Sequence, residues 1–219
     1  MSALLEMKDI EKSFNGSPVL KKVQFTVDAG EVHALMGENG AGKSTLIKIL
    51  TGIYPKDGGQ IFWNGQPVEI NSRQDASRLG IAVIYQELSL IPTLSVMQNV
   101  MLGKEENRMG FINAKTMRKK VTGLIQKYHF SFKADDIVET LTIAQRQTVE
   151  ILKALSEESR LVIMDEPTAS LSARESDTLF GIVDQLRNDG VSVIYNSHRL
   201  NEVYRLSDRL TVLRDGVRE

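Results

Sequence analysis

The pattern of apolar and polar positions predicts strands in the first third of the chain. Apolar side chains occupy every second position of VQFTV at 23–27, and a DAG turn leads from there to the apolar run VHALMG at 32–37. This pattern indicates a strand pair. The segment GGQIFWNGQPVEI at 58–70 is typical of a hairpin, with Asn64 and Gly65 in the tight turn.

The rest of the chain alternates between strand-like and helix-like patterns. Ser72 is placed to cap a short helix, and Ser172 with Glu175 forms a capping box for a helix that we expect to run to Gly190. The pattern over 93–155 is helical, with no convincing strand. Further strands are predicted at 80–86, 161–165, 191–197 and, as the last of the chain, 209–215. Strands that alternate with helices predict an α/β fold with a parallel sheet covered on both faces.

Composition and charge place the chain among ordinary globular proteins. Its 219 residues allow one large domain or a domain with a subdomain, and 25% charged with 42% hydrophobic residues exclude a disordered chain. The formal net charge of −1 gives no simple electrostatic case for binding nucleic acid or an anionic membrane. The basic run KTMRKK at 115–120 is interpreted as a solvated helix face. Because the chain has no cysteine, disulfides and thiolate metal sites are excluded.

The segment GENGAGKS at 37–44 carries the strongest indication of chemistry. It fits G-x-x-x-x-G-K-[ST], follows a predicted strand and precedes the helix-like STLIKILTG. Its glycines let the backbone N–H groups surround phosphates, Lys43 supplies a positive charge, and the Ser44 hydroxyl is placed to bind Mg²⁺. We therefore predict that the chain binds a nucleoside triphosphate. The predicted binding residues are Gly37, Glu38, Asn39, Gly40, Ala41, Gly42, Lys43, Ser44 and Thr45.

Two adjacent carboxylates end the predicted strand LVIMD, and Pro167 follows them. Neighbouring strand residues point to opposite sides, so Asp165 and Glu166 are expected to have separate roles. Beside a phosphate loop, Asp165 fits the residue that holds Mg²⁺, and Glu166 fits the base that orients and deprotonates the attacking water. The alternative that the two acids only cap the following helix stays open.

Four motifs follow one another in an order and spacing that are typical of one ATPase family. They are GENGAGKST, the strand-ending Gln86, LVIMDEPTASLS and YNSHR, and with them the chain resembles the ATPase domain of ABC transporters over essentially its whole length. IYQELSLIPTLSVMQNVMLG, DEPTASL and VSVIYNSHRLNEV are similar to the N-terminal half of the tandem ATPase subunit of bacterial carbohydrate importers, the ribose, galactose, xylose and arabinose group.

The resemblance implies a single ABC ATPase domain over 1–219. It would comprise a phosphate-loop core with a parallel sheet and an antiparallel β subdomain at 1–92 and 156–219, and an inserted helical subdomain at 93–155. Because members of this group usually carry two such domains in one polypeptide, we expect the chain to be a fragment, or the first half, of a longer tandem protein.

The resemblance also implies roles for single residues. Gln86 would contact Mg²⁺ and the lytic water, His198 would contact the γ-phosphate, and Phe14 would stack on the adenine. Taken alone, these residues have ordinary explanations: a glutamine that caps a loop, a hydrogen-bonded structural histidine and a phenylalanine of the core. His33 and His129 match no motif and are expected to be hydrogen-bonded structural residues.

The segment LTIAQRQ at 141–147 departs from the L-S-G-G-Q signature of most ABC ATPases. In the family this motif cradles the γ-phosphate bound by the opposite domain, so the resemblance assigns that position to Thr142, Ile143, Ala144 and Gln145. A helix is expected to begin near Ala144 or Gln145. Ile143 replaces a glycine with a β-branched side chain that would crowd a phosphate. We therefore expect Thr142 and Ile143 to border a site that binds nucleotide poorly or hydrolyses none.

The resemblance further implies ATP, Mg²⁺ and several protein partners. A second ATPase domain, in the same polypeptide or in a dimer, would contact the loop 169–172. Transmembrane permease subunits would dock near ELSLIPTLSV, with a sugar-binding protein involved indirectly, no nucleic acid, and a location on the cytoplasmic face of the cell membrane; the isolated chain is expected to be soluble. Docking would use apolar residues that look exposed, although subdomain core is the alternative: Leu88, Leu90, Ile91 and Leu94.

The leading hypothesis is therefore an ATPase that energises carbohydrate import, with weak activity as an isolated domain. One alternative is a soluble ABC ATPase that acts on ribosomes or nucleic acid. Balanced charge, and no long basic or coiled-coil insertion between Gln86 and Asp165, argue against it. A second alternative is a regulatory module that binds ATP without turnover, and Glu166 and His198 argue against that.

Overall fold

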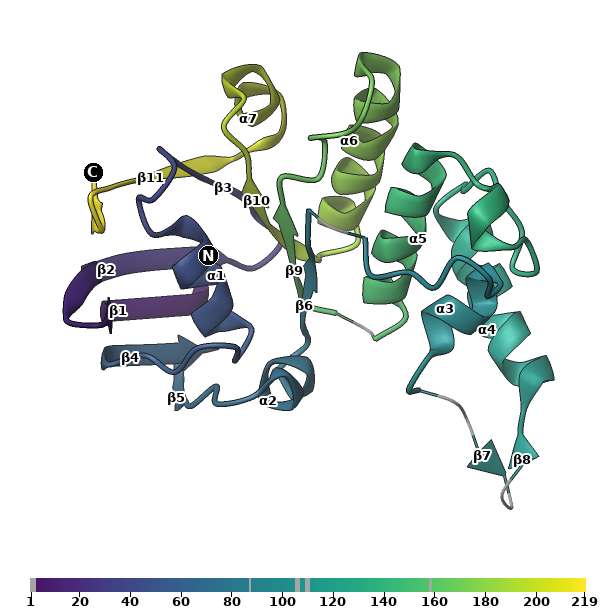
Figure 1. Cartoon of the computed structure of the whole chain (residues 1–219), viewed down its shortest axis with the longest axis horizontal. Helices are drawn as coiled ribbons and strands as arrows, with labels where there is room; N and C mark the ends of the chain where they lie inside the picture. The colour runs from purple at the N-terminus through teal and green to yellow at the C-terminus, as the bar shows by residue number, and fades with distance from the viewer. Residues whose placement is uncertain (1–2, 87, 105–106, 109–110, 158) are drawn as a thin grey trace.

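A computed structural model of the chain shows two main sheets (Figure 1). It describes residues 3–86, 88–104, 107–108, 111–157 and 159–219. The smaller sheet is antiparallel, with the strand order β2-β1-β4-β5. Its strands are β1 (Ala3–Phe14), β2 (Ser17–Asp28), β4 (Gly58–Trp63) and β5 (Gln66–Val68). β4 and β5 form the predicted hairpin, in which Asn64 and Gly65 have φ angles of 50° and 75°.

The larger sheet is parallel apart from one edge strand and has the order β12-β11-β3-β10-β9-β6. Its strands are β3 (Val32–Gly37), β6 (Ile81–Ile84), β9 (Leu161–Asp165), β10 (Ser192–Asn196), β11 (Arg209–Arg214) and β12 (Val217–Arg218). Almost every side chain of β9 and β10 is buried, which is typical of central strands in a parallel sheet.

Helices cover both faces of the larger sheet, as the sequence predicts (Figure 1). They are α1 (Lys43–Leu50), α2 (Arg73–Arg78), α5 (Ile143–Leu155), α6 (Ala173–Asn188) and α7 (Leu200–Leu206). α1 lies on the face toward the smaller sheet, where Leu46 and Ile163 belong to one core with residues of β1 and β2. On the opposite face Val183 of α6 and Leu206 of α7 share a second core with Met164 of β9.

A third core joins the helices of the middle segment, where Val100, Val121 and Val149 are completely buried. These helices are α3 (Val96–Met101), α4 (Ala114–Lys127), the 3₁₀ turn η1 (Val138–Thr140) and α5. The basic run of α4 is a solvated face, as predicted, because only Met117 of 115–120 is buried. A short hairpin of β7 (Asn107–Arg108) and β8 (Phe111–Ile112) interrupts the predicted helical pattern. The boundaries of the helical subdomain stay a prediction.

The predicted strand pair of 23–27 with 32–37 is wrong, although both strands exist. β2 pairs with β1, whereas β3 pairs in parallel with β10 and β11 in the other sheet. The physical reason lies in their burial. β2 alternates between buried and exposed residues, as a strand with one covered face does, but β3 has buried residues in succession and fits the middle of a parallel sheet.

The ends of β6 and α6 and the last strand of the chain also differ from the prediction. β6 ends at Ile84, so Gln86 follows the strand by two residues instead of ending it. α6 ends at Asn188, where Gly190 with a φ of 79° turns the chain. The strand at 209–215 is not the last one, because β12 follows it through a tight turn.

The predicted helix caps are confirmed. The Ser72 side chain accepts a hydrogen bond from the Asp75 N–H, and Ser172 and Glu175 form a reciprocal capping box at α6. Within the described residues, none of the helices has the length and apolar character needed to cross a membrane.

Candidate functional site

The glycine-rich loop connects the end of β3 to the start of α1. Three of its glycines have backbone conformations with positive φ angles. Gly37, Gly40 and Gly42 have φ angles of 149°, 87° and 106°. A Cβ atom on Gly37 would lie 2.2 Å from the Leu213 carbonyl oxygen, and one on Gly42 would lie 2.6 Å from a methyl carbon of Leu20. Both positions therefore need glycine for space as well as for conformation.

Lys43, the first residue of α1, is folded back over this loop. Its side chain is largely buried, and the ammonium group donates hydrogen bonds to the carbonyl oxygens of Gly37 at 2.7 Å and Glu38 at 3.0 Å. The positive charge of Lys43 is thus held at the centre of the turn, beside the start of α1.

A cavity of about 330 Å³ opens in front of the loop, and we call it the loop cavity. It collects residues from five separate places in the sequence, and three of these places hold predicted site residues. Its lining residues are Val19, Asn39, Gly40, Gly42, Lys43, Ser44, Thr45, Gln86, Asp165, Glu166 and Asn196. Segments that are far apart in the chain meet here because β3, β6, β9 and β10 run in parallel and end at one edge of the sheet.

The two acids face the same cavity, so the expectation that they point to opposite sides is wrong. β9 ends at Asp165, and Glu166 already lies beyond the strand with a φ of 48°. The alternation of side chains therefore stops between them. The Glu166 N–H donates to the Asn196 carbonyl oxygen at 2.9 Å, which holds this left-handed conformation, and the Asn196 side chain donates to Asp165 Oδ1 at 2.5 Å.

His198 is close to Glu166 but is not among the residues that line the loop cavity. Its Nδ1 lies 3.3 Å from Glu166 Oε1, and 60% of its side chain is exposed. It lies instead at a neighbouring hollow with Met36, Leu200 and Leu210. The structure thus brings His198 next to one of the acids through a side-chain contact.

Phe14 is also outside the lining of the loop cavity. Its ring makes an edge-to-face contact with Tyr54, with the centroids 5.1 Å apart, and the Lys12 ammonium lies 5.5 Å from the ring centroid. Val19, in β2, lines the cavity on this side. No motif marks Val19 in the sequence, because a single valine in an alternating strand is indistinguishable from its neighbours.

The signature segment starts α5 one or two residues earlier than predicted, since the helix begins at Ile143. Thr142 is the N-cap: its hydroxyl accepts from the Gln145 N–H at 3.2 Å, and Gln145 Oε1 accepts from the Thr142 N–H at 3.0 Å. The capping box engages the Thr142 hydroxyl and the Gln145 N–H, and it does not involve the N–H groups of Ile143 and Ala144. Ile143 is 54% exposed, while Thr142, Ala144 and Gln145 line a separate hollow of about 240 Å³ between α5 and α6.

A buried carboxylate fixes the segment that follows the two acids. Glu202, 3% exposed, accepts hydrogen bonds from the hydroxyls of Thr168, Tyr195 and Ser197 at 2.8 to 3.0 Å. Burial raises the pKa of Tyr195, and the nearby Glu202 charge raises it further, so Tyr195 stays a hydrogen-bond donor. Sequence reasoning missed this network, because only the fold brings Thr168 and Glu202 together.

A second network anchors the opposite end of β3. His33 bonds with Glu31 at 3.0 Å and with Thr211 at 2.8 Å, which confirms its expected structural role. Burial raises the pKa of Glu31, but hydrogen bonds from His33 and Arg209 outweigh it and lower that pKa to about 2. A hydrogen-bonded structural role is also expected for His129, and this expectation is wrong. The His129 side chain is exposed just beyond α4, where the backbone has a φ of 54°.

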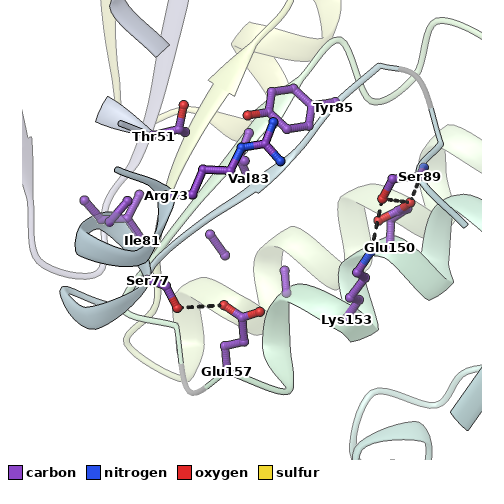
Figure 2. Close-up of a pocket in the computed structure, with 13 residues that line it drawn as sticks. Thr51, Arg73, Ser77, Ile81, Val83, Tyr85, Ser89, Glu150, Lys153 and Glu157 are labelled. Atoms are coloured by element: carbon purple, nitrogen blue, oxygen red, sulfur yellow. Dashed lines mark hydrogen bonds between the residues drawn. The ribbon is translucent and has the colours of Figure 1, made fainter. Parts of the chain in front are cut away.

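A hollow of about 380 Å³ lies between α2, β6 and α5, and Figure 2 shows the residues that line it. Glu150 Oε1 accepts from the N–H and the hydroxyl of Ser89, at 2.6 and 2.9 Å, and Lys153 donates to the same hydroxyl at 3.1 Å. The Tyr85 hydroxyl is buried and has no hydrogen-bond partner among the described residues. We call this the β6–α5 hollow.

The apolar residues beside this hollow are exposed only in part. Leu88 and Ile91 are 37% and 39% exposed, as predicted. Leu90 and Leu94 are half-buried, and Leu90 packs against the core of the helical segment, so for these two the prediction of an exposed patch is wrong.

Solved structures place this architecture among known folds. An ATP-binding cassette of an ABC transporter in its ADP conformation superimposes with a TM-score of 0.90 and 24% sequence identity, over 100% of this chain and 90% of that one. A nucleotide-free cassette gives a TM-score of 0.89 over 99% of this chain and 89% of that one, also with 24% identity. The fold is that of an ATP-binding cassette.

Sequence comparison gives the family. The model of the ABC transporter family matches residues 20–169, and the chain belongs to this family. It is 51% identical to the ribose import ATP-binding protein RbsA of Yersinia pestis over 213 residues, which are 97% of this chain and 42% of that protein. It is 46% identical to the Bacillus cereus protein of the same name over 99% of this chain and 44% of that protein. The chain thus spans less than half the length of these relatives.

Proposed function

We propose that the loop cavity binds ATP and that the chain is the ATP-binding and ATP-hydrolysing domain of a subunit that energises carbohydrate import. The observation that carries the proposal is the meeting of the phosphate loop, Gln86, Asp165 and Glu166 in one cavity. The identity of 46–51% to ribose import ATP-binding proteins supports the coupling to import. Among the described residues, no feature favours the alternative of a ribosomal or nucleic-acid ATPase.

Phosphate binding would rest on the loop and on the start of α1. The glycines at 37, 40 and 42 keep the backbone open to a ligand, and α1 presents its free N–H groups and its positive end to the same place. Lys43 would exchange the carbonyl oxygens that it now contacts for phosphate oxygens. For Phe14, stacking on the adenine stays a proposal, since its ring contacts Tyr54 and does not line the loop cavity.

The residues present fit a magnesium ion bound together with phosphates. Ser44, Gln86 and Asp165 offer a hydroxyl, an amide oxygen and a carboxylate to one cavity. Among the described residues, no group of three or more His, Cys, Asp or Glu side chains is placed to hold a metal ion. Mg²⁺ in phosphate sites is commonly held by one or two carboxylates and by substrate oxygens. When bound, the ion would neutralise charge on the phosphates.

Glu166 would orient and deprotonate the attacking water. Its left-handed backbone turns the carboxylate into the loop cavity, and His198 contacts that carboxylate from the other side. The water proton would pass to Glu166, while His198 would approach the γ-phosphate. Little covalent chemistry is needed from the protein, because positioned donors stabilise the charge of the transition state.

A second ATPase domain would complete the site. In this proposal, the loop 169–172, whose Ala169 and Ser170 are exposed, contacts that domain. The signature end of α5 would face a weaker site, because Ile143, 54% exposed, projects at the position of a glycine. The chain alone would then bind ATP and hydrolyse it slowly, and it would be the first half of a tandem protein.

Permease subunits would dock at the β6–α5 hollow, on the cytoplasmic face of the membrane (Figure 2). Tyr85, which directly precedes Gln86, lines the hollow, and Leu88 and Ile91 are exposed beside it. A partner bound there would be linked to the loop cavity through the short segment of Tyr85 and Gln86. The unpaired Tyr85 hydroxyl could bond with that partner. The sugar-binding protein would act through the permease only.

Calorimetry on the chain tests the nucleotide proposal. MgATP is expected to bind more tightly than ATP with EDTA, and AMP, which lacks the β- and γ-phosphates, is expected to bind weakly. Equal affinity for AMP and ATP would contradict binding through the phosphate loop. Coupling to import is tested by ribose uptake in cells whose ribose importer carries this chain in place of its own N-terminal ATPase domain. Absence of uptake, with ATP binding intact, would reject the transport role only.

A further inference from the structure

Asn196, the last residue of β10, lies between the two acids. Its Nδ2 donates to Asp165 Oδ1 at 2.5 Å, and its carbonyl oxygen accepts from the Glu166 N–H at 2.9 Å. The side chain is 2% exposed and contributes to the lining of the loop cavity. A single residue therefore contacts both members of the pair, one through its side chain and the other through its main chain.

The register of the sheet explains this arrangement. Asn196 is aligned with Asp165 in the parallel pairing of β10 with β9, so both side chains project from the same face. Two residues earlier, Ile194 and Ile163 are aligned in the same way and belong to the core that includes α1. Asn196 and Asp165 thus project toward the side of the sheet on which α1 and the phosphate loop lie.

The other end of the Asn196 amide is unsatisfied. Its Oδ1 is buried and has no hydrogen-bond partner among the described residues. The orientation of the amide follows from chemistry, because only the NH₂ group can donate to a carboxylate. A buried carbonyl oxygen without a donor destabilises the folded chain, whereas an apolar side chain of the same size would not. The amide is therefore poorly explained as a stabilising residue, and its one contribution is a donor placed on Asp165.

We propose that Asn196 is a positioning residue that holds the Asp165 carboxylate in the orientation needed for a divalent cation. Asn196 donates to Oδ1, which leaves the second carboxylate oxygen of Asp165 to a cation, and Asp165 lines the loop cavity together with Ser44 and Gln86. Partners that orient metal-binding carboxylates commonly affect metal affinity strongly. This inference rests on the proposed function, since it concerns the metal that would accompany ATP.

The experiment measures Mn²⁺ binding to the nucleotide-loaded chain by electron paramagnetic resonance. The variants are Asn196→Leu, Asp165→Asn and the double substitution. Asn196→Leu is expected to weaken Mn²⁺ binding by about tenfold, with unchanged nucleotide affinity in EDTA and an equal or higher melting temperature. In the Asp165→Asn background the leucine is expected to cause no further loss, because the residue acts through Asp165. Asn196→Ala serves the same comparison if the leucine variant does not fold.

Gln147→Leu is the matched control, since Gln147 is also a buried amide with a group, its Nε2, that has no partner among the described residues, and it lines the hollow between α5 and α6. It is expected to leave Mn²⁺ binding unchanged. Wild-type Mn²⁺ affinity in Asn196→Leu would overturn the inference and leave the proposed function standing. A loss of stability and of metal-free nucleotide binding together would also overturn it, in favour of a structural role. If the wild-type chain binds nucleotide without any effect of Mn²⁺, the proposed function fails, and the inference fails with it.

Discussion

Two helix N-termini in this molecule have opposite chemistry. α1 begins after Gly42, which has no side chain to cap the helix and adopts a φ of 106°. α5 begins after Thr142, whose hydroxyl accepts from the Gln145 N–H, while the Gln145 side chain accepts from the Thr142 N–H. The first end has no side chain bonded to its N–H groups, whereas the second satisfies one N–H group of its first turn, that of Gln145, with its own N-cap.

The difference shows that a helix N-terminus becomes a ligand site through what its sequence omits. Glycine at the cap of α1 removes the competing side chain, and Lys43 adds a positive charge at the same place. Threonine and glutamine three residues apart form a capping box at the N-terminus of α5. The family's L-S-G-G-Q signature has the same spacing of hydroxyl and glutamine, and LTIAQ differs from it chiefly by Ile143 and Ala144 in place of two glycines. That the loop cavity and the signature end of α5 belong to sites of unequal strength stays a proposal, which rests on Ile143, 54% exposed at the position of a glycine.

The largest expected effect is on the chemical step at the loop cavity. Glu166→Gln should lower the rate of ATP hydrolysis by about 10²- to 10⁴-fold, because the amide cannot accept the proton of the attacking water. Nucleotide and metal binding should persist, since the amide keeps the shape of the side chain. Phosphate release with protein in excess of ATP measures the rate, and calorimetry measures the binding.

Asp165→Asn is the control for this prediction. It should weaken the Mg²⁺-dependent part of ATP binding, whereas Glu166→Gln should not. If both variants lose stability to the same degree and show no difference in metal dependence, the assignment of separate roles is wrong.

A smaller effect is expected on nucleotide affinity at the start of α1. Lys43→Ala should weaken MgATP binding by about 10- to 100-fold, the range expected when a charged donor to a buried ligand is removed. The fold should survive, because Lys43 contacts only loop carbonyl oxygens through its ammonium group. Calorimetry for affinity and thermal unfolding for stability check the two halves of the prediction. An unchanged affinity would show that the loop does not bind the phosphates.

The loop could be predicted from sequence because its chemistry is local. The spacing of Gly37, Gly42, Lys43 and Ser44 defines both a turn and a helix start, whatever the rest of the fold does. Strand pairing could not be predicted in the same way. The pattern of VHALMG correctly predicts a strand, but the partners of this strand, β10 and β11, lie more than 150 residues further along the chain. Contacts between residues that are far apart in the sequence decide which sheet a strand joins.

The site outside the loop divides in the same manner. Asp165 and Glu166 were visible because a buried apolar run ends in them, yet their common orientation depends on a φ of 48° that no residue type announces. Asn196 and Glu202 were missed altogether. Each becomes informative only when the fold sets it beside Asp165 or Thr168.

The third effect concerns the far end of β3, which carries the phosphate loop. Glu31 has a pKa of about 2 in the folded chain, against 4.5 in the unfolded chain. Its folded pKa is depressed, so its contribution to stability is present above pH 4.5 and is lost as the pH falls toward 2. Glu31→Gln should lower the free energy of unfolding at pH 7 by about 1–3 kcal/mol, through lost charge-assisted hydrogen bonds.

Urea unfolding between pH 7 and pH 2 measures this dependence. The wild-type chain should lose stability more steeply than Glu31→Gln within the window from pH 4.5 to 2. Equal slopes for the two proteins would show that Glu31 is not the group responsible. ATP affinity at pH 7 should stay close to the wild-type value under conditions where the variant is folded, because the Glu31 carboxylate bonds with Asp28, His33 and Arg209 and is not among the groups that line the loop cavity.

The smallest effect is expected at the N-terminus of α5. Thr142→Ala removes the N-cap hydroxyl, and it should lower the free energy of unfolding by about 1 kcal/mol and the melting temperature by about 2–4 °C. ATP affinity of the chain should not change, because Thr142 and Gln145 bond with each other and do not line the loop cavity. Thr142→Ser, which keeps the hydroxyl, should restore most of the stability. The two helix ends would then respond in opposite ways: Lys43→Ala would lose ligand and keep stability, and Thr142→Ala would lose stability and keep ligand. If Thr142→Ala instead weakens ATP binding as much as Lys43→Ala does, the two N-termini serve nucleotide equally, and the contrast drawn from their caps is wrong.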